Sequence, residues 1–118
     1  MKKILFATLV AAVVALANTA SIAHDFGPVW LSAQRFATLP DGVRYPEGIT
    51  ANPDTGDIFT ATFDFDPAHT NKLLRFDRQG HLAASRDLAG AALGLGFRSG
   101  KVYLLEFGSG RVLRIAAG

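Results

Sequence analysis

The feature that most constrains the fold of this 118-residue chain is an internal repeat. Shifting the sequence by about 46 residues superimposes three short motifs on three others, with a shorter turn and a shorter loop in the second copy. The matched motifs are Gly48-Ile49 with Gly94-Leu95, Gly56-Asp57-Ile58-Phe59 with Gly100-Lys101-Val102-Tyr103, and Asn71-Lys72-Leu73-Leu74-Arg75-Phe76 with Gly110-Arg111-Val112-Leu113-Arg114-Ile115. Each copy therefore offers three strands, and the third strand ends in the same pattern of two apolar residues, an arginine and another apolar residue.

The segments between the turn signals have the composition of β-strands, because they are rich in β-branched, aromatic and leucine residues. The expected strands are 29–39, 48–51, 57–63, 72–77, 81–88, 93–97, 101–107 and 111–115. Turns at 52–56, 77–80 and 98–100 end in glycine, where a tight hairpin needs a positive φ angle. No helical period is convincing after residue 23, and the sequence therefore predicts an all-β protein.

Repeats of about 40 to 50 residues with four short antiparallel strands are typical of β-propeller blades. Residues 45–88 would form one full blade, and residues 93–115 would form most of a second. Closed propellers usually take about four to eight blades. We therefore expect residues 45–118 to be the first two blades of an incomplete propeller, a fragment of a longer protein, after a linker at 24–44 that holds a candidate ring-closing strand. A small β-sandwich is the alternative, because two copies are the minimum from which a period can be claimed.

Residues 1–23 contain the three parts of a secretory signal peptide. Lys2-Lys3 is a basic start, residues 4–17 are an uncharged apolar run, and Ser21-Ile22-Ala23 offers small residues to signal peptidase. A transmembrane anchor is the alternative, but the apolar run is shorter than the roughly 20 residues that a spanning helix needs. We therefore expect cleavage by signal peptidase before His24, no stable membrane anchor afterwards, and a periplasmic or secreted protein. The chain has no cysteine, which excludes both a lipoprotein and disulfide bonds.

The charge of the chain changes when the signal peptide is removed. The sequence has 12 Lys and Arg against 10 Asp and Glu, a net charge of +2, and two of the lysines are Lys2 and Lys3. The mature chain is therefore formally neutral and has no basic patch of the kind that binds nucleic acid or an anionic membrane surface. We expect a small-molecule substrate or ligand as the partner, and no nucleic acid.

One resemblance to a known family follows from the first repeat. Tyr45-Pro46-Glu47-Gly48-Ile49, followed by residues 52–59 and 71–77, resembles the start of the regucalcin/gluconolactonase family, also called the senescence-marker-protein family. The resemblance covers the chain after Pro40 and implies a six-bladed β-propeller. Strictosidine-synthase-like and other six-bladed propellers have similar blade sequences, so the resemblance points to the fold more than to one activity.

The same resemblance implies an exported, metal-dependent hydrolase of lactones or related esters. In that family a glutamate at the start of the innermost strand of the first blade binds a divalent cation, calcium or zinc, and Glu47 holds that place. Such a cation can polarise a lactone carbonyl and lower the pKa of an attacking water. The family pattern Gly-Pro-x-Trp is replaced here by Gly48-Ile49-Thr50, and the further ligands would lie beyond residue 118. A buried, paired glutamate is the alternative role for Glu47, and no catalytic residue is assigned.

Blade geometry predicts a second group of residues on the face that carries Glu47, because the loop entering the first strand and the loop between the second and third strands open on one face. These residues are Asp64, Asp66, His69 and Glu106. The segment 63–69 is a long, acidic loop, and long surface loops often bind ligands. Solvated loop charge is the alternative reading. The second function hypothesis is therefore a non-catalytic six-bladed propeller that binds a ligand or a protein on its loop face.

Overall fold

The computed structural model describes residues 31–118, so the signal peptide expected at 1–23 lies outside the described residues. The described strands all belong to one compact unit, residues 33–118. Residues 31–118 contain seven strands and no helix, which confirms the all-β prediction. In this part of the chain, accordingly, no helix is long and apolar enough to cross a membrane.

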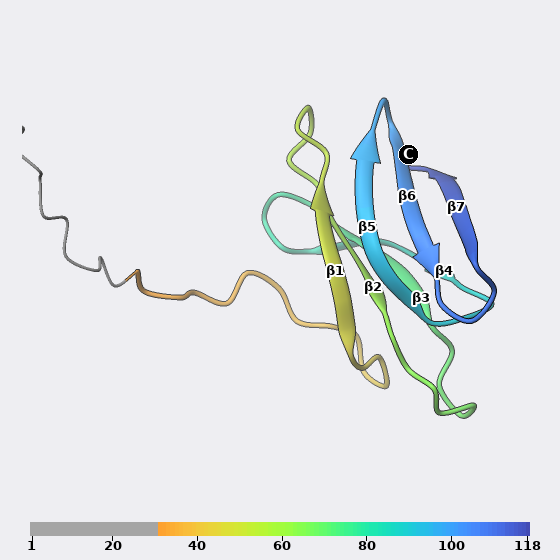
Figure 1. Ribbon diagram of the computed structural model, residues 1–118. Coiled ribbons are helices and arrows are strands. Elements are labelled where there is room, and N and C mark those ends of the chain that lie inside the picture. Colours follow the sequence, from red (N-terminus) through yellow and green to blue (C-terminus); the bar gives the residue numbers. More distant parts are fainter. Residues whose placement is uncertain (1–30) are drawn as a thin grey trace, which may run out of the picture. The chain divides into compact units, whose positions relative to one another are not determined.

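The strands form two antiparallel sheets, which we call sheet A and sheet B (Figure 1). Sheet A contains, in spatial order, β1 (Pro46–Ala51), β2 (Ile58–Thr62), β3 (Lys72–Phe76) and β4 (Leu82–Asp87). Sheet B contains β5 (Ala92–Arg98), β6 (Lys101–Glu106) and β7 (Arg111–Ala116). Each strand pairs with the next strand along the chain, so both sheets are simple meanders. All seven strands coincide with segments that the sequence predicts as strands.

Residues 31–39, the described part of the strand expected at 29–39, have no regular structure. A ring-closing strand would pair with a last blade outside residues 31–118, so that role stays a prediction. Residues 35–39 lie instead over the face of sheet A that presents Ile58, Thr60 and Phe76. A segment on the face of a sheet meets side chains and not the unpaired backbone of an edge strand, so it has no ladder to join. The approach is close, because a Cβ atom on Gly80 would lie 2.1 Å from the carbonyl oxygen of Phe36.

The two sheets repeat one cross-strand register, which confirms the sequence repeat. In sheet A the pairs are Ile58 with Phe76, Phe59 with Arg75, Thr60 with Leu74 and Ala61 with Leu73. In sheet B the equivalent pairs are Val102 with Ile115, Tyr103 with Arg114, Leu104 with Leu113 and Leu105 with Val112. Each of these pairs in sheet B joins the two residues that the sequence repeat aligns with a pair in sheet A.

The hydrophobic core lies between the two sheets. Its buried side chains are Phe59, Ala61 and Leu73 from sheet A, Ala92, Val102, Leu104 and Ile115 from sheet B, and Leu88 from the link between the sheets. Phe59 and Phe97 stack across the core with ring centroids 6.0 Å apart. Arg75 also joins the sheets, since its Nη1 donates a hydrogen bond to the Ala117 carbonyl at 2.6 Å.

The two sheets contribute different faces to this core. Leu73 of sheet A points into the core, whereas the equivalent Val112 of sheet B is 63% exposed. Leu105, the equivalent of buried Ala61, is 49% exposed. Side chains alternate between the two faces of a strand. The face of sheet B that is equivalent to the core-facing face of sheet A therefore points away from the core. The sheets therefore stack head to tail.

The loops that carry the candidate site residues gather at one end of the sheets, the lower end in Figure 1. The loop 63–71 joins β2 to β3, and the loop 107–110 joins β6 to β7. Phe63 N donates to the Tyr45 carbonyl at 2.9 Å, and Phe107 N donates to the Ala91 carbonyl at 2.8 Å. The starts of β1 and β5 therefore lie at the same end, which we call the loop face.

Candidate functional site

The loop 63–71 is fixed by the buried side chain of Asn71. Its amide oxygen accepts hydrogen bonds from Thr62 Oγ1 at 3.0 Å and from the backbone N–H of Asp64 at 2.8 Å. Its amide nitrogen donates to the Asp64 carbonyl at 2.8 Å. Because a buried polar group without a partner is costly, these three bonds set the path of the loop and the positions of the side chains that it presents.

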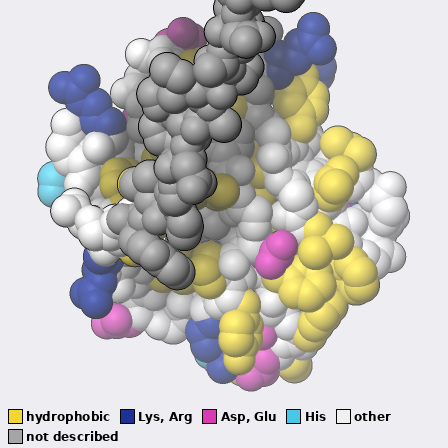
Figure 2. Space-filling view, turned by 60° about the vertical axis from the view of Figure 1, so that its left-hand side comes forward, with side chains coloured by type: hydrophobic (Ala, Val, Ile, Leu, Met, Phe, Trp, Pro, Cys, Tyr) yellow, Lys and Arg dark blue, Asp and Glu magenta, His cyan; other side chains and the backbone are white. Residues whose placement is uncertain are grey.

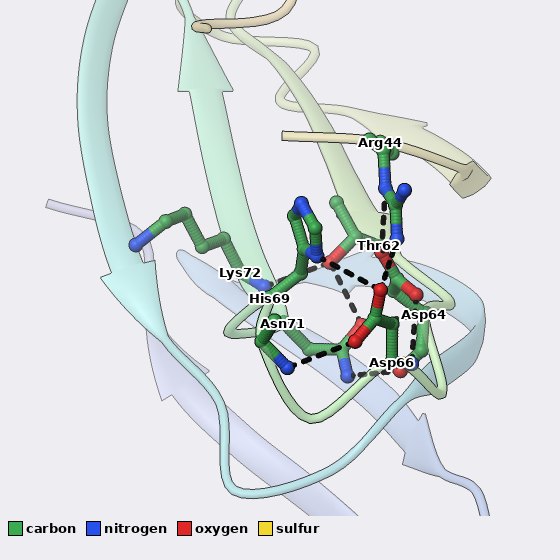
Figure 3. A network of polar contacts seen from close by, with 8 residues as sticks. Arg44, Thr62, Asp64, Asp66, His69, Asn71 and Lys72 are labelled. Atoms are coloured by element: carbon green, nitrogen blue, oxygen red, sulfur yellow. Dashed lines mark hydrogen bonds and ion pairs between the residues drawn. The ribbon is translucent and has the colours of Figure 1, made fainter. Parts of the chain in front are cut away.

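Two aspartates of this loop share one arginine (Figure 3). Arg44 donates to Asp64 Oδ2 from Nε at 3.0 Å and from Nη2 at 2.9 Å, and Nη2 also lies 3.3 Å from Asp66 Oδ2. His69 Nδ1 lies 3.4 Å from the same Asp66 oxygen. The side chain of Asp64 is 5% exposed and that of Asp66 is 44% exposed. The network therefore buries one carboxylate and leaves the other open to solvent.

Both carboxylates are ionised at neutral pH. The pKa of Asp64 lies below its ordinary value chiefly because its Oδ1 accepts a hydrogen bond from the backbone N–H of Asp66 at 2.9 Å, with Arg44 adding to the effect. The pKa of Asp66 is lowered chiefly by the backbone N–H of Ala68, which donates to its Oδ1 at 3.0 Å, and then by His69 and Arg44. Two carboxylates against one guanidinium leave Asp64, Asp66 and Arg44 together with one net negative charge.

Glu106 belongs to a separate network at the end of β6. Its Oε2 accepts hydrogen bonds from Ser109 Oγ at 2.5 Å and from Arg111 Nε and Nη2 at 2.9 and 2.5 Å. Ser109 and, after it, Arg111 lower the pKa of Glu106 below its ordinary value, because both donate to the charged carboxylate. Its other oxygen, Oε1, is buried and has no partner among the described residues.

Three phenylalanines join the two loops of the loop face. The rings of Phe63 and Phe65 meet edge to face with centroids 4.8 Å apart, and the ring of Phe107 lies 5.3 and 5.5 Å from them. Phe65 is 65% exposed and Phe107 is 48% exposed. Beside them is an open hollow of about 470 Å³, lined by both loops and by the link between β4 and β5. Other exposed hydrophobic side chains lie on the strands, among them Ile49, Leu105 and Val112. Figure 2 shows one face of the molecule, on which hydrophobic side chains gather over one part of the surface.

Glu47 lies at the loop face but joins neither polar network. It is exposed on β1 and pairs in register with Ala61, and its side chain makes no hydrogen bond or ion pair with another described residue. The alternative role, a buried glutamate paired with a group of a later blade, depends on residues outside 31–118 and stays a prediction. In the same range no three His, Cys, Asp or Glu side chains lie close enough together to hold a metal ion. Glu47 is the one ligand that the resemblance places within these residues, so the calcium or zinc site stays a prediction, and we derive no step through a metal.

The structure brings together three of the five residues singled out from the sequence, namely Asp64, Asp66 and His69. The reading of this loop as solvated charge does not apply to Asp64, which is buried, but it fits Asp66, which is open to solvent. Sequence reasoning missed Arg44, Asn71 and the phenylalanine cluster. One signal for the cluster was present, since the repeat aligns Phe63 with Phe107 at the ends of equivalent strands.

The loop face combines exposed aromatic rings, an open carboxylate and a hollow lined by two loops. Comparison with known proteins adds nothing to identify its ligand or its activity. No protein family, curated protein or solved structure matches the chain.

Proposed function

We propose that this chain forms part of a six-bladed β-propeller whose loop face binds a small-molecule ligand. The head-to-tail stacking of the two sheets supports the propeller. In a sandwich, two sheets close one core between their inner faces. In a propeller, each blade presents a new face to the next blade. The exposed face of sheet B, with Leu105 and Val112, has the same residue positions as the face of sheet A that packs against its neighbour.

The observation that carries the binding function is the exposure of Phe65 and Phe107 beside the hollow. Exposed aromatic side chains that adjoin a concave surface are typical of ligand sites. The loop beneath them is held by Asn71 and by the Arg44 network, so a ligand would meet preformed positions and would lose little free energy in ordering them.

The test is a small-molecule screen read by the backbone amide signals of the protein in NMR. Ligands should shift the signals of residues 63–71 and 107–110, and Phe65→Ala should weaken their binding about tenfold or more. Ile49→Ala is the matched control, because Ile49 is an exposed apolar residue of β1 that does not line this hollow. Ligands that shift other regions, or that bind the Phe65 variant equally well, would count against the proposal.

The lactonase is the second candidate, favoured by the free, exposed carboxylate of Glu47 at the loop face. If residues outside 31–118 complete a metal site with Glu47, then Glu47→Gln should abolish both metal retention and lactone hydrolysis in the full-length protein. Asp54→Asn, which changes an exposed carboxylate in the β1–β2 turn, should alter neither. Unchanged turnover in the Glu47 variant would reject this candidate.

Export to the periplasm or the medium is part of the same proposal. The order of charged, apolar and small residues in 1–23 supports it. The mature protein should begin at His24, and sequencing of its N-terminus from the exported fraction tests this.

A further inference from the structure

The charged residues that line the loop-face hollow include no lysine or arginine. The acidic residues that line it are Asp64 and Asp66, and His69 also lines it. Arg44 pairs with both aspartates but does not line the hollow, and one guanidinium against two carboxylates leaves one net negative charge. Asp66 is the carboxylate that a ligand would meet, because its side chain is 44% exposed whereas that of Asp64 is 5% exposed. The wall of the hollow is therefore anionic.

The rings beside the hollow have the same electrostatic preference. The face of a phenylalanine ring carries partial negative charge and attracts cations. Phe65 and Phe107 expose much of their surface and are held edge to face by Phe63. An apolar ligand could bind to the rings alone, and an anion would be repelled by Asp66. A cation with apolar substituents gains from both.

We propose that the loop-face hollow binds an organic cation, an amine or quaternary ammonium group that contacts Phe65 and Phe107 with its carbon atoms and Asp66 with its charge. The proposal rests on the ligand-binding function proposed above and names the class of ligand. A hollow of about 470 Å³ has room for a compact cation of this kind. The depressed pKa of Asp66 supports it, since the carboxylate keeps its charge at neutral pH.

The experiment compares choline with its neutral isostere 3,3-dimethyl-1-butanol and with acetate, each titrated into the full chain and followed by NMR. Choline should shift the signals of residues 63–71, the isostere should bind about tenfold more weakly, and acetate should not bind. Asp66→Asn should remove most of the preference for choline over the isostere. This variant keeps an oxygen to accept the Ala68 N–H, so the loop should retain its structure. Asp54→Asn, in the distant β1–β2 turn, is the matched control.

The outcomes separate this inference from the function on which it rests. If both uncharged and charged probes bind equally and Phe65→Ala weakens both, the ligand site stands and the cation class is wrong. If choline does not bind, or if Asp66→Asn leaves its affinity unchanged, the cation class is likewise overturned. If Phe65→Ala has no effect on any probe that binds, the ligand site itself is misplaced.

Discussion

Asn71 makes three hydrogen bonds with one buried amide, and the loop of the candidate site depends on them. Asn71→Ala leaves the buried backbone N–H of Asp64 without its partner, so the free energy of unfolding should fall by about 2 kcal/mol. Asn52→Ala is the control, since Asn52 Oδ1 accepts only an exposed hydrogen bond from Asp54 N, and its cost should stay below about 1 kcal/mol. Urea unfolding measures both, and equal costs would contradict the role given to Asn71.

Acid should destabilise the fold through carboxylates whose pKa values are depressed, among them Glu106, Asp64 and Asp66. Where folding depresses a pKa, the unfolded chain binds the proton more readily. The stabilisation is therefore complete above the ordinary value, 4.5 for Glu106, and is lost as the pH falls through the folded value. Glu106→Gln should lower stability at pH 7 and make the decline below about pH 4.5 shallower. Urea unfolding across this pH range checks both effects, and an unchanged slope would contradict the prediction.

The sequence could predict that the polar residues of one loop lie close together in space. It could not predict which residues from other parts of the chain form hydrogen bonds or ion pairs with them. Asp64, Asp66 and His69 lie in one loop, so their proximity follows from their spacing. Arg44 is twenty residues from Asp64, and their contact depends on the loop path that Asn71 sets. Nothing in the local pattern of residues encodes that path.

Gly48 occupies a β-bulge in β1 and lies against β5. Its φ is +75°, and a Cβ atom there would lie 2.6 Å from the Leu93 carbonyl oxygen. Gly48→Ala should cost about 2 to 4 kcal/mol, because it adds a backbone clash to the strain of a positive φ. Gly100 has a φ of +70° but open space around it, so Gly100→Ala should cost about 1 kcal/mol from strain alone. Denaturant unfolding of the pair separates clash from strain, and equal costs would show that β1 and β5 do not pack this closely.

At the scale of elements, the strands were predictable where glycine turns bound them and apolar residues filled them. The turns at 52–56 and 98–100 have the positive φ angles that the sequence predicts, at Gly56 and Gly100. The segment 31–39 has a strand-like composition but pairs with no strand among the described residues. Composition reports what a segment can bury but not whether it lies against an edge or a face of a sheet.

At the scale of the molecule, the repeat fixes how the sheets stack. Equivalent residues keep equivalent partners within each sheet, yet Leu73 is buried and Val112 is exposed. This difference follows if every sheet packs on the next in the same way. One face of sheet B then packs against sheet A, and its other face is left for a further sheet. The sequence encodes the repeat unit and the register of its strands, but two repeats do not encode the number of blades that close a ring.

The continuation of the stack can be measured by comparing equivalent residues in the full-length protein. Leu73→Ala removes a side chain buried between sheets A and B and should cost about 2 to 5 kcal/mol. If a further sheet covers sheet B, as a six-bladed ring requires, Val112→Ala should also destabilise, by about 1 to 2 kcal/mol, because it removes two buried methyl groups. An uncovered Val112 should cost less than about 0.5 kcal/mol. Thermal or denaturant unfolding distinguishes these values. If Val112→Ala leaves the stability unchanged while Leu73→Ala lowers it, no further sheet covers sheet B and the ring is ruled out.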